Sequence, residues 1–204
     1  GSVPIGLFQA TARTLRFLES NILSSTIPSE VGDLSLLQAS LLQHNWFTKT
    51  IPSSIAQLSS IIILDIGDNY LTSSLPPELK YLTTLNQLTI AENDFTGSLD
   101  SILGQLENSS LTLLHASNNM FSGQLPNELF DLPQLTNLLL SANCFDGSLP
   151  DNICHNPAME VLALDGLGAS THCPDSVSVP FSEVRLFNSM HGSVPAGLFS
   201  MPNL

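Results

Sequence analysis

Histidine, cysteine and acidic side chains are the groups in this 204-residue sequence that could carry out catalysis or bind a metal ion. The five histidines are scattered, and no HExxH, HxH or CxxC pattern provides the ligand spacing that zinc sites use. His172 and Cys173 are adjacent, but neighbouring positions in a sequence do not by themselves form a nucleophile–base pair. We therefore predict no enzymatic activity and no metal site.

Two further patterns have a weak chemical interpretation. The GLG sequence at 166–168 follows an expected strand, but it lacks the GxGxxG spacing and the following helix of a dinucleotide site, so no cofactor is predicted. Asp65, Asp68 and Glu92 are expected near one another on neighbouring strand ends, where they could bind calcium. A solvated acidic surface is the favoured interpretation of these three residues.

The composition excludes two classes of partner. The formal net charge is -13 and only five residues are Lys or Arg, so the chain has no electrostatic attraction for the phosphates of a nucleic acid. No run of about 18 apolar residues is present, so the sequence predicts no membrane-spanning segment. Charged residues make up 11% of the chain, well below the roughly 25% of a typical soluble domain, so uncharged polar side chains must form much of the surface.

A repeat organises the chain, and the segment 135–150 shows it as LxxLxLxxNxFxGxLP. Its asparagine recurs at intervals of 24, 24, 24, 26 and 24 residues, at Asn21, Asn45, Asn69, Asn93, Asn119 and Asn143. The LxL alternation predicts a short strand with one buried face, and such strands must stack to bury that face. We expect each asparagine to be buried where the chain leaves the strand, bonding backbone groups in a continuous ladder.

The pattern resembles the leucine-rich repeat of the plant-specific 24-residue class, LxxLxxLxLxxNxLxGxIPxxLGxL, and similar repeats occur in stramenopile algae such as diatoms. The resemblance implies an α/β fold: a right-handed solenoid with a parallel sheet on the concave face and short 3-10 or helical turns on the convex face. It also implies a second short sheet on one flank. Members of this class are typically ectodomains of receptor kinases and receptor-like proteins, or secreted cell-wall inhibitors.

We expect a single domain over 1–204, with regular repeats at 1–167, an island at about 168–180 and a final partial repeat at 181–204. Both ends of the chain lie within a repeat, which suggests a segment of a longer protein. A Cys154–Cys173 disulfide would close a loop at the island and stabilise it by ~3 kcal/mol, while Cys144 could compete for either partner or stay free. The glycosylation sequon at Asn108 lies near the two extra residues of the longest interval, where an exposed loop could carry a glycan.

Two sets of residues are candidate binding surfaces. The residue between the inward positions of each strand is expected to point into the concave groove, and this row contains Arg16, Leu41, Asp65, Thr89, His115, Leu139, Ala163 and Arg185. On the flank, Trp46 and Tyr70 occupy equivalent positions in neighbouring repeats and could anchor a partner. The alternatives are that the concave row is merely tolerated surface and that the two aromatic residues cover a thin edge.

These features predict a non-catalytic recognition module of an extracellular or membrane-anchored receptor-like protein, with a protein, peptide or glycan as ligand. A secreted hydrolase inhibitor, similar to polygalacturonase inhibitors, is one alternative. An intracellular scaffold with reduced cysteines, and hence a cytoplasmic location, is the other. The sequon, the cysteine pair and the resemblance favour an extracellular or cell-surface location over a cytoplasmic one.

Overall fold

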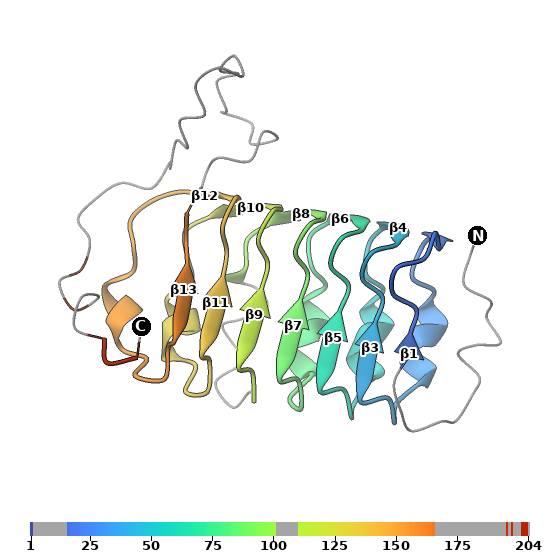
Figure 1. The fold of residues 1–204 in the computed structure, drawn as a ribbon, viewed down its shortest axis with the longest axis horizontal. Helices are drawn as coiled ribbons and strands as arrows, with labels where there is room; N and C mark the ends of the chain where they lie inside the picture. Colours follow the sequence, from blue (N-terminus) through green and yellow to red (C-terminus); the bar gives the residue numbers. More distant parts are fainter. Residues whose placement is uncertain (2–15, 101–109, 166–194, 196, 198–200, 204) are drawn as a thin grey trace, which may run out of the picture.

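The computed structural model describes residues 1, 16–100, 110–165, 195, 197 and 201–203. The chain winds into an elongated solenoid whose successive turns build two parallel sheets, with short 3-10 turns behind the larger sheet (Figure 1). This architecture confirms the fold that the repeat predicted.

The larger sheet, which we call the concave sheet, has seven strands in the order β1-β3-β5-β7-β9-β11-β13. Every pair is parallel, and the central residues Leu64, Leu88 and Leu114 lie opposite one another in the register. The strands are β1 (Arg16–Phe17), β3 (Ala39–Leu41), β5 (Ile63–Asp65), β7 (Gln87–Thr89), β9 (Leu113–His115), β11 (Asn137–Leu139) and β13 (Val161–Ala163). Their outward side chains therefore form rows that run across the strands.

A second parallel sheet lies along one flank and has six strands in the order β12-β10-β8-β6-β4-β2. Each of its strands begins one to three residues after a repeat asparagine. The strands are β2 (Ser24–Ser25), β4 (Trp46–Lys49), β6 (Tyr70–Ser73), β8 (Asp94–Gly97), β10 (Met120–Gly123) and β12 (Cys144–Phe145).

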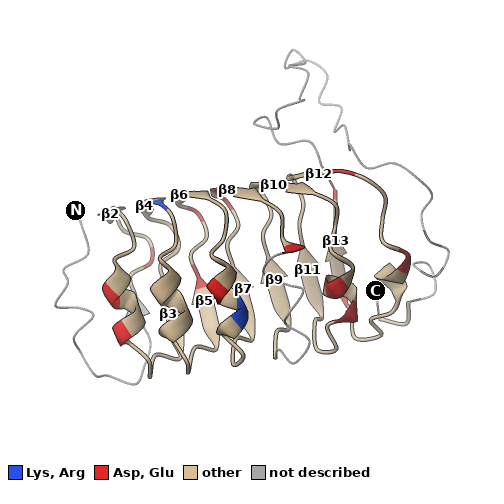
Figure 2. Ribbon diagram, turned by 180° about the vertical axis from the view of Figure 1, so that it is seen from behind, with Lys and Arg blue, Asp and Glu red and all other residues tan. Residues whose placement is uncertain are grey.

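Proline fixes the start of each described 3-10 turn on the convex side. The residue before each turn is a proline with φ between -73° and -59° and ψ between 130° and 149°, so the chain arrives extended and then coils. The turns are η2 (Ser29–Asp33), η3 (Ser53–Gln57), η4 (Pro77–Tyr81), η5 (Asn127–Asp131) and η6 (Asp151–Cys154). Acidic residues predominate on this side (Figure 2), with Lys80 as a basic residue in η4.

The asparagine ladder is present from the second described repeat onward. The side-chain nitrogen of Asn93 donates hydrogen bonds to the carbonyls of Ile66, Ile90 and Ala91 at 3.0, 3.3 and 3.1 Å. Its side-chain oxygen accepts a hydrogen bond from the backbone N–H of Leu71 at 2.9 Å. The same pattern is made by Asn45, Asn69, Asn119 and Asn143. Each amide therefore ties two adjacent repeats together.

Asn21 lies at the end of the ladder and differs from the others. It is exposed, and among the described residues its side-chain nitrogen donates to the carbonyls of Leu18 and Glu19 in its own repeat. The expectation that all six asparagines are buried is therefore wrong for this one.

An apolar column runs beside the ladder and forms the centre of the core. The residues two positions after the five buried asparagines are almost completely buried, whereas Leu23 after Asn21 is partly buried. The rings of Phe95 and Phe121 stack with centroids 6.1 Å apart and planes 15° from parallel. The column contains Phe47, Leu71, Phe95, Phe121 and Phe145. Burying each of these side chains contributes about 2–3 kcal/mol, so this column is a major source of cohesion between repeats.

The predicted Cys154–Cys173 disulfide is wrong, because Cys154 is a free thiol and Cys144 is the disulfide-bonded cysteine among the described residues. Cys144 begins β12 on the flank, whereas Cys154 ends η6 on the convex side. There the sulfur of Cys154 packs against Gly197, where an added Cβ would lie 2.8 Å from it. Separation along the chain gave no information about the directions in which the two thiols point.

Several predictions concern residues outside the described part of the chain. They are the glycosylation at Asn108, the island at about 168–180, Cys173, Arg185 and most of the final repeat 181–204. Of that last repeat, Met201 packs against the core and the side chain of Asn203 donates to the carbonyl of Pro157 at 2.8 Å. Within the described residues, no helical segment has the length and apolar character needed to cross a bilayer.

Replacing Asn93 by alanine should lower the free energy of unfolding by about 2 kcal/mol or more, because buried backbone groups of two repeats lose their partner. Urea denaturation of the purified chain measures this loss. Asn127→Ala is the matched control, since Asn127 is exposed at the start of η5, and it should change stability by less than about 0.5 kcal/mol. Equal effects of the two changes would contradict a structural role for the ladder.

Peptide mapping without reduction should find Cys154 alkylated and Cys144 accessible to alkylation only after reduction. Mass spectrometry of the digested chain identifies both states directly. A cross-linked peptide that joins Cys154 to Cys173 would instead restore the pairing expected from the sequence.

Candidate functional site

The middle of the concave sheet presents a row of side chains that we call the central row. The parallel register places one residue from each of six strands in line, and all six are partly exposed. The row contains Leu41, Asp65, Thr89, His115, Leu139 and Ala163. The structure therefore brings together these residues of the predicted concave surface, with apolar side chains on both sides of a polar centre.

Arg16 does not belong to this row, which corrects the prediction. The register pairs Phe17 with Leu41 and Arg16 with Ser40, so Phe17 is the residue of β1 aligned with the central row. Asn21 follows Phe17 by four residues, as Asn45 follows Leu41 by four. The error came from assuming an extra residue in the first repeat, where the strand pattern is weak.

Asp65 is the acidic residue of the central row and lies next to Leu41 in it. Partial burial raises the pKa of its carboxyl above the ordinary value of 3.8, because desolvation disfavours the ionised form. A hydrogen bond from the backbone N–H of Gly67 at 3.0 Å and the nearby His44 and His115 act in the opposite direction, while Glu19 adds to the increase. Asp65 is thus a carboxylate whose desolvation is only partly compensated within the protein.

Small residues lie beside the central row. Gly67, Ala91 and Ser117 are buried, and they occupy equivalent positions two residues after Asp65, Thr89 and His115. A Cβ at Gly67 would lie 3.2 Å from the carbonyl oxygen of Ala91 and 3.3 Å from a carboxylate oxygen of Asp65. The carbonyls of these three residues accept hydrogen bonds from backbone N–H groups of the preceding repeat, so the strip holds adjacent repeats together beside the row.

A row of polar and charged side chains borders the strip at the positions just before the asparagines. His44 pairs with Asp68, and the side-chain amide of Asn118 donates to the carboxylate of Glu92, in both cases between adjacent repeats. All four residues are exposed and have φ between 49° and 56°. Among the described residues, no group of three His, Cys, Asp or Glu side chains is placed to hold a metal ion.

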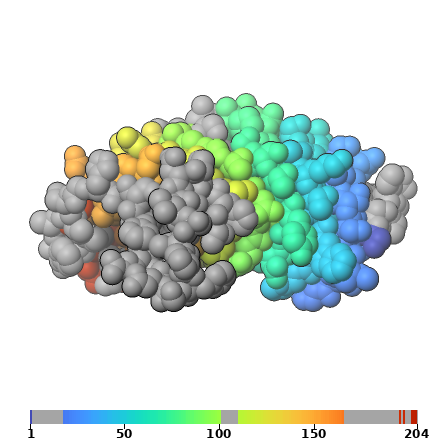
Figure 3. All heavy atoms as spheres, turned by 90° about the horizontal axis from the view of Figure 1, so that it is seen from above, coloured from blue at the N-terminus to red at the C-terminus, as the bar shows by residue number. Residues whose placement is uncertain are grey.

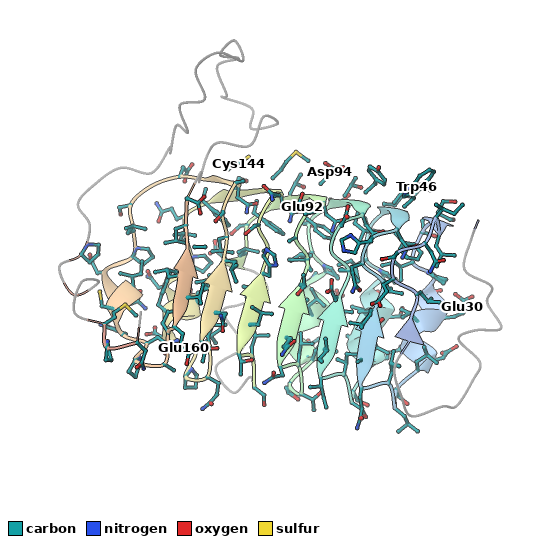
Figure 4. All side chains as sticks on the ribbon, viewed as in Figure 1. Glu30, Trp46, Glu92, Asp94, Cys144 and Glu160 are labelled. Carbon is teal, nitrogen blue, oxygen red and sulfur yellow. The ribbon has the colours of Figure 1, made fainter. Side chains whose placement is uncertain are left out.

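The flank carries the second predicted surface. The side chains of Trp46 and Tyr70 are 54% and 55% exposed, and Ile22 at the same position of the preceding repeat is 67% exposed. Trp46, Asp94 and Cys144 come from three strands of the second sheet and lie along one edge of the molecule (Figure 4). Trp46 and Tyr70 are not directly opposite, because the register pairs Tyr70 with Thr48 and Trp46 with Ser24.

A shallow groove that the sequence did not reveal lies at the start of the concave strands. Its volume is about 510 Å³, and its lining consists of Ser59, Ser60, Ile62, Thr84, Asn86 and Ser110. The hydroxyl of Thr84 donates to the carbonyl of Ile61 at 2.7 Å, and the side-chain amide of Asn86 donates to the carbonyl of Ser110 at 2.8 Å. These polar groups already stabilise contacts between repeats, which leaves the groove few unsatisfied groups for a ligand.

Comparison with known proteins supports the identification of the repeat. Two segments of the chain, residues 60–82 and 110–132, match the family model described as Leucine Rich Repeat. No curated protein sequence matches the chain.

Solved structures with the same solenoid include receptor ectodomains of plants. The plant peptide hormone receptor RGFR1 in complex with RGF2 has a TM-score of 0.80 and 26% identity over all of this chain and 33% of that one. The Arabidopsis receptor kinase HAESA ectodomain, in complex with an IDA peptide hormone, has a TM-score of 0.74 and 29% identity over 80% of this chain and 27% of that one. The Arabidopsis SOBIR1 ectodomain has a TM-score of 0.58 and 28% identity over 62% and 67%.

The chain spans a third or less of the length of the first two of these relatives. Together with its repeat pattern and its two parallel sheets, the similarity shows that the chain folds as a leucine-rich repeat solenoid, as the ectodomains of these plant receptors do.

Replacing Asp65 by asparagine should raise the melting temperature at neutral pH, because the folded state no longer contains a desolvated carboxylate. Well below pH 3.8 the carboxyl is protonated in both the folded and the unfolded state, and the gain should vanish. As the pH rises from there through the raised folded-state pKa, the unfolded chain binds fewer protons than the folded chain, so the wild type loses stability relative to the variant.

Thermal unfolding followed by circular dichroism over a pH series measures this difference. Asp33→Asn on η2 is the matched control, since Asp33 is exposed, and it should leave the melting temperature unchanged. A lower melting temperature for Asp65→Asn at neutral pH would show that its hydrogen bond from Gly67 outweighs the desolvation.

Proposed function

We propose that this leucine-rich repeat chain is the ligand-recognition part of an extracellular receptor-like protein, and that a peptide or protein segment binds across its central row. The observation that carries the proposal is the contrast between the two sides of the concave strands. Inward positions are almost uniformly aliphatic, as at Leu64, Leu88 and Leu114. The outward positions of the same strands differ in chemistry from one strand to the next, as a surface that selects among ligands requires.

The spacing of the central row suits an extended chain. A ligand that crosses the strands meets one side chain of the row about every 4.8 Å, the distance between neighbouring strands. It would contact an apolar group at Leu41, polar groups at Asp65, Thr89 and His115, and an apolar group again at Leu139. Such an alternation would favour peptides whose apolar and polar side chains follow one another in the matching order.

The charge of this surface favours a basic ligand. Asp65, Asp68 and Glu92 lie on or beside the central row, and the whole chain has a net charge of -13. Complementary charge accelerates association and suppresses binding of acidic competitors. A Lys or Arg side chain, or a free amino terminus, placed against Asp65 would supply the ion pair that its partly buried carboxylate does not form with any described residue.

The similar structures support the location and the class of ligand. RGFR1 is described as a peptide hormone receptor in complex with RGF2, and HAESA as a receptor kinase whose ectodomain is in complex with an IDA peptide hormone. We infer that the present chain is likewise extracellular, and that anchorage in a membrane and any signalling domain belong to parts of a longer protein.

We propose a role in binding without catalysis. Asp65 accepts a hydrogen bond from a backbone amide and His44 is paired with Asp68. Among the described residues, neither Asp65 nor His44 is hydrogen-bonded to a serine, threonine or cysteine side chain that could act as a nucleophile.

Selection from a displayed library of random linear peptides on the immobilised chain tests the proposal. Enriched peptides should carry a basic residue and an apolar residue at a fixed separation, matching Asp65 and Leu139. Isothermal titration calorimetry should then show at least about tenfold weaker binding of these peptides to the Asp65→Asn and Leu139→Ala variants.

Tyr81→Ala is the matched control, since Tyr81 is 61% exposed on the opposite side of the solenoid in η4. It should bind the selected peptides with unchanged affinity. Peptides that bind all these variants equally would place the binding site away from the central row and refute the proposal.

A further inference from the structure

The outward side of the second sheet, which we call the flank face, carries two kinds of side chain in alternation along its strands. Bulky residues occupy the first position of β4 and β6, where Trp46 and Tyr70 are more than half exposed. Two residues further along each strand lies a small hydroxyl side chain, on the same side of the sheet because alternate residues share a face. The hydroxyl row contains Ser24, Thr48, Thr72, Thr96 and Ser122.

The hydroxyl groups of this row are largely unpartnered. That of Thr48 lies 3.4 Å from the carbonyl of Ser25, and the other four have no hydrogen-bond partner within the described part of the chain. By contrast, hydroxyl groups at the edge where the concave strands begin do have hydrogen-bond partners. Thr84 and Thr136 donate to backbone carbonyls of neighbouring repeats at 2.7 and 3.1 Å. The same residue types therefore stabilise contacts between repeats at one edge and face solvent with free hydrogen-bonding capacity at the other.

The register places each aromatic ring beside a hydroxyl. Trp46 is directly opposite Ser24 and Tyr70 is directly opposite Thr48. Trp46 and Tyr70 are consequently offset by two residues on adjacent strands, which separates their Cα atoms by about 8 Å. The two rings are far enough apart to stack against different units of one polymer, with hydroxyl groups between them.

The flank face is electrically neutral on a strongly acidic chain. Among its strands β2, β4, β6, β8, β10 and β12, the charged residues are Lys49 and Asp94, one of each sign. The net charge of -13 for the whole chain repels an acidic polymer, and no concentration of charge on this face attracts a basic one. The absence of net charge on the flank face therefore favours an uncharged ligand over an acidic or a basic one.

We propose that the flank face binds a neutral polysaccharide, with pyranose rings stacked on Trp46 and Tyr70 and sugar hydroxyls bonded to the hydroxyl row. A pyranose ring has an apolar face that packs on an aromatic side chain and a rim of hydroxyls that needs donors and acceptors at regular intervals. The strand spacing of about 4.8 Å is comparable with the length of one sugar unit, so a chain lying across the strands stays in register with the row. This site is separate from the central row and does not depend on the function proposed for it.

The surface is open at the repeats that carry these residues. Figure 3 looks down onto the side of the molecule where the second sheet lies, and the blue-to-green repeats are uncovered there. Trp46 lies at this edge (Figure 4) and is the single tryptophan of the chain. Tryptophan fluorescence therefore reports on the proposed site alone.

Titration of the 204-residue chain with cellohexaose, mannohexaose and xylohexaose tests the proposal. At least one of these neutral oligosaccharides should cause a saturable change in fluorescence, and acidic oligogalacturonate should cause none. Tyr70→Ala, which leaves the reporter in place, should weaken binding of that oligosaccharide at least about tenfold. Thr72→Val should weaken it severalfold without lowering the melting temperature, because its hydroxyl has no partner among the described residues.

Tyr81→Ala and Thr84→Val are the matched controls, one an exposed aromatic on η4 and the other a hydroxyl that bonds the backbone. Both should bind the oligosaccharide as the wild type does, and Thr84→Val should lower the melting temperature. The proposal is overturned if none of the neutral oligosaccharides changes the fluorescence at millimolar concentration, if oligogalacturonate binds more tightly, or if Tyr70→Ala binds as the wild type. Isothermal titration calorimetry of a Trp46→Phe variant confirms binding without the reporter.

Discussion

Backbone groups left unpaired where the chain turns off each concave strand are the constraint on which this solenoid depends. Burying them without partners would cost about 1–3 kcal/mol each, and every repeat contains several. A single asparagine amide per repeat satisfies them, as at Asn93, which bonds carbonyls on two repeats and the N–H of Leu71. Since each amide must reach the repeat before it, the ladder fixes the distance and the register between neighbouring repeats.

The two candidate binding surfaces follow from this arrangement. Once the ladder and the buried column of Phe95 and Phe121 determine the inward positions, the outward positions of both sheets are free to vary without loss of core packing. On the concave sheet, the outward positions form the central row, which changes from apolar to polar and back to apolar. On the flank, the outward positions carry aromatic rings and hydroxyl groups. The regular core thus provides fixed spacing, and the variable surface provides the chemistry.

Some of these surface positions are held at an energetic cost. His44, Asp68 and Glu92 have positive φ, a conformation that non-glycine residues adopt with a penalty of order 1 kcal/mol or more. At the end of the flank strands, Lys49 also has a positive φ of 68°, whereas Gly97 occupies the equivalent position two repeats later. Side chains are therefore present where glycine would be more stable, at the end of the solenoid that carries the exposed aromatic rings.

The sequence by itself determined the repeat, the positions of the strands and the identity of the ladder asparagines, because each of these is encoded by a local pattern that recurs along the chain. The tertiary structure decided what depends on contacts between segments about 24 residues apart. It showed that Phe17 rather than Arg16 joins the central row, that Cys154 is free, and that Tyr70 lies opposite Thr48. It also distinguished the hydroxyl of Thr84, which bonds the backbone, from that of Thr72, which has no partner within the described residues. Residue type cannot make these distinctions, since they depend on how one turn of the solenoid is aligned against the next.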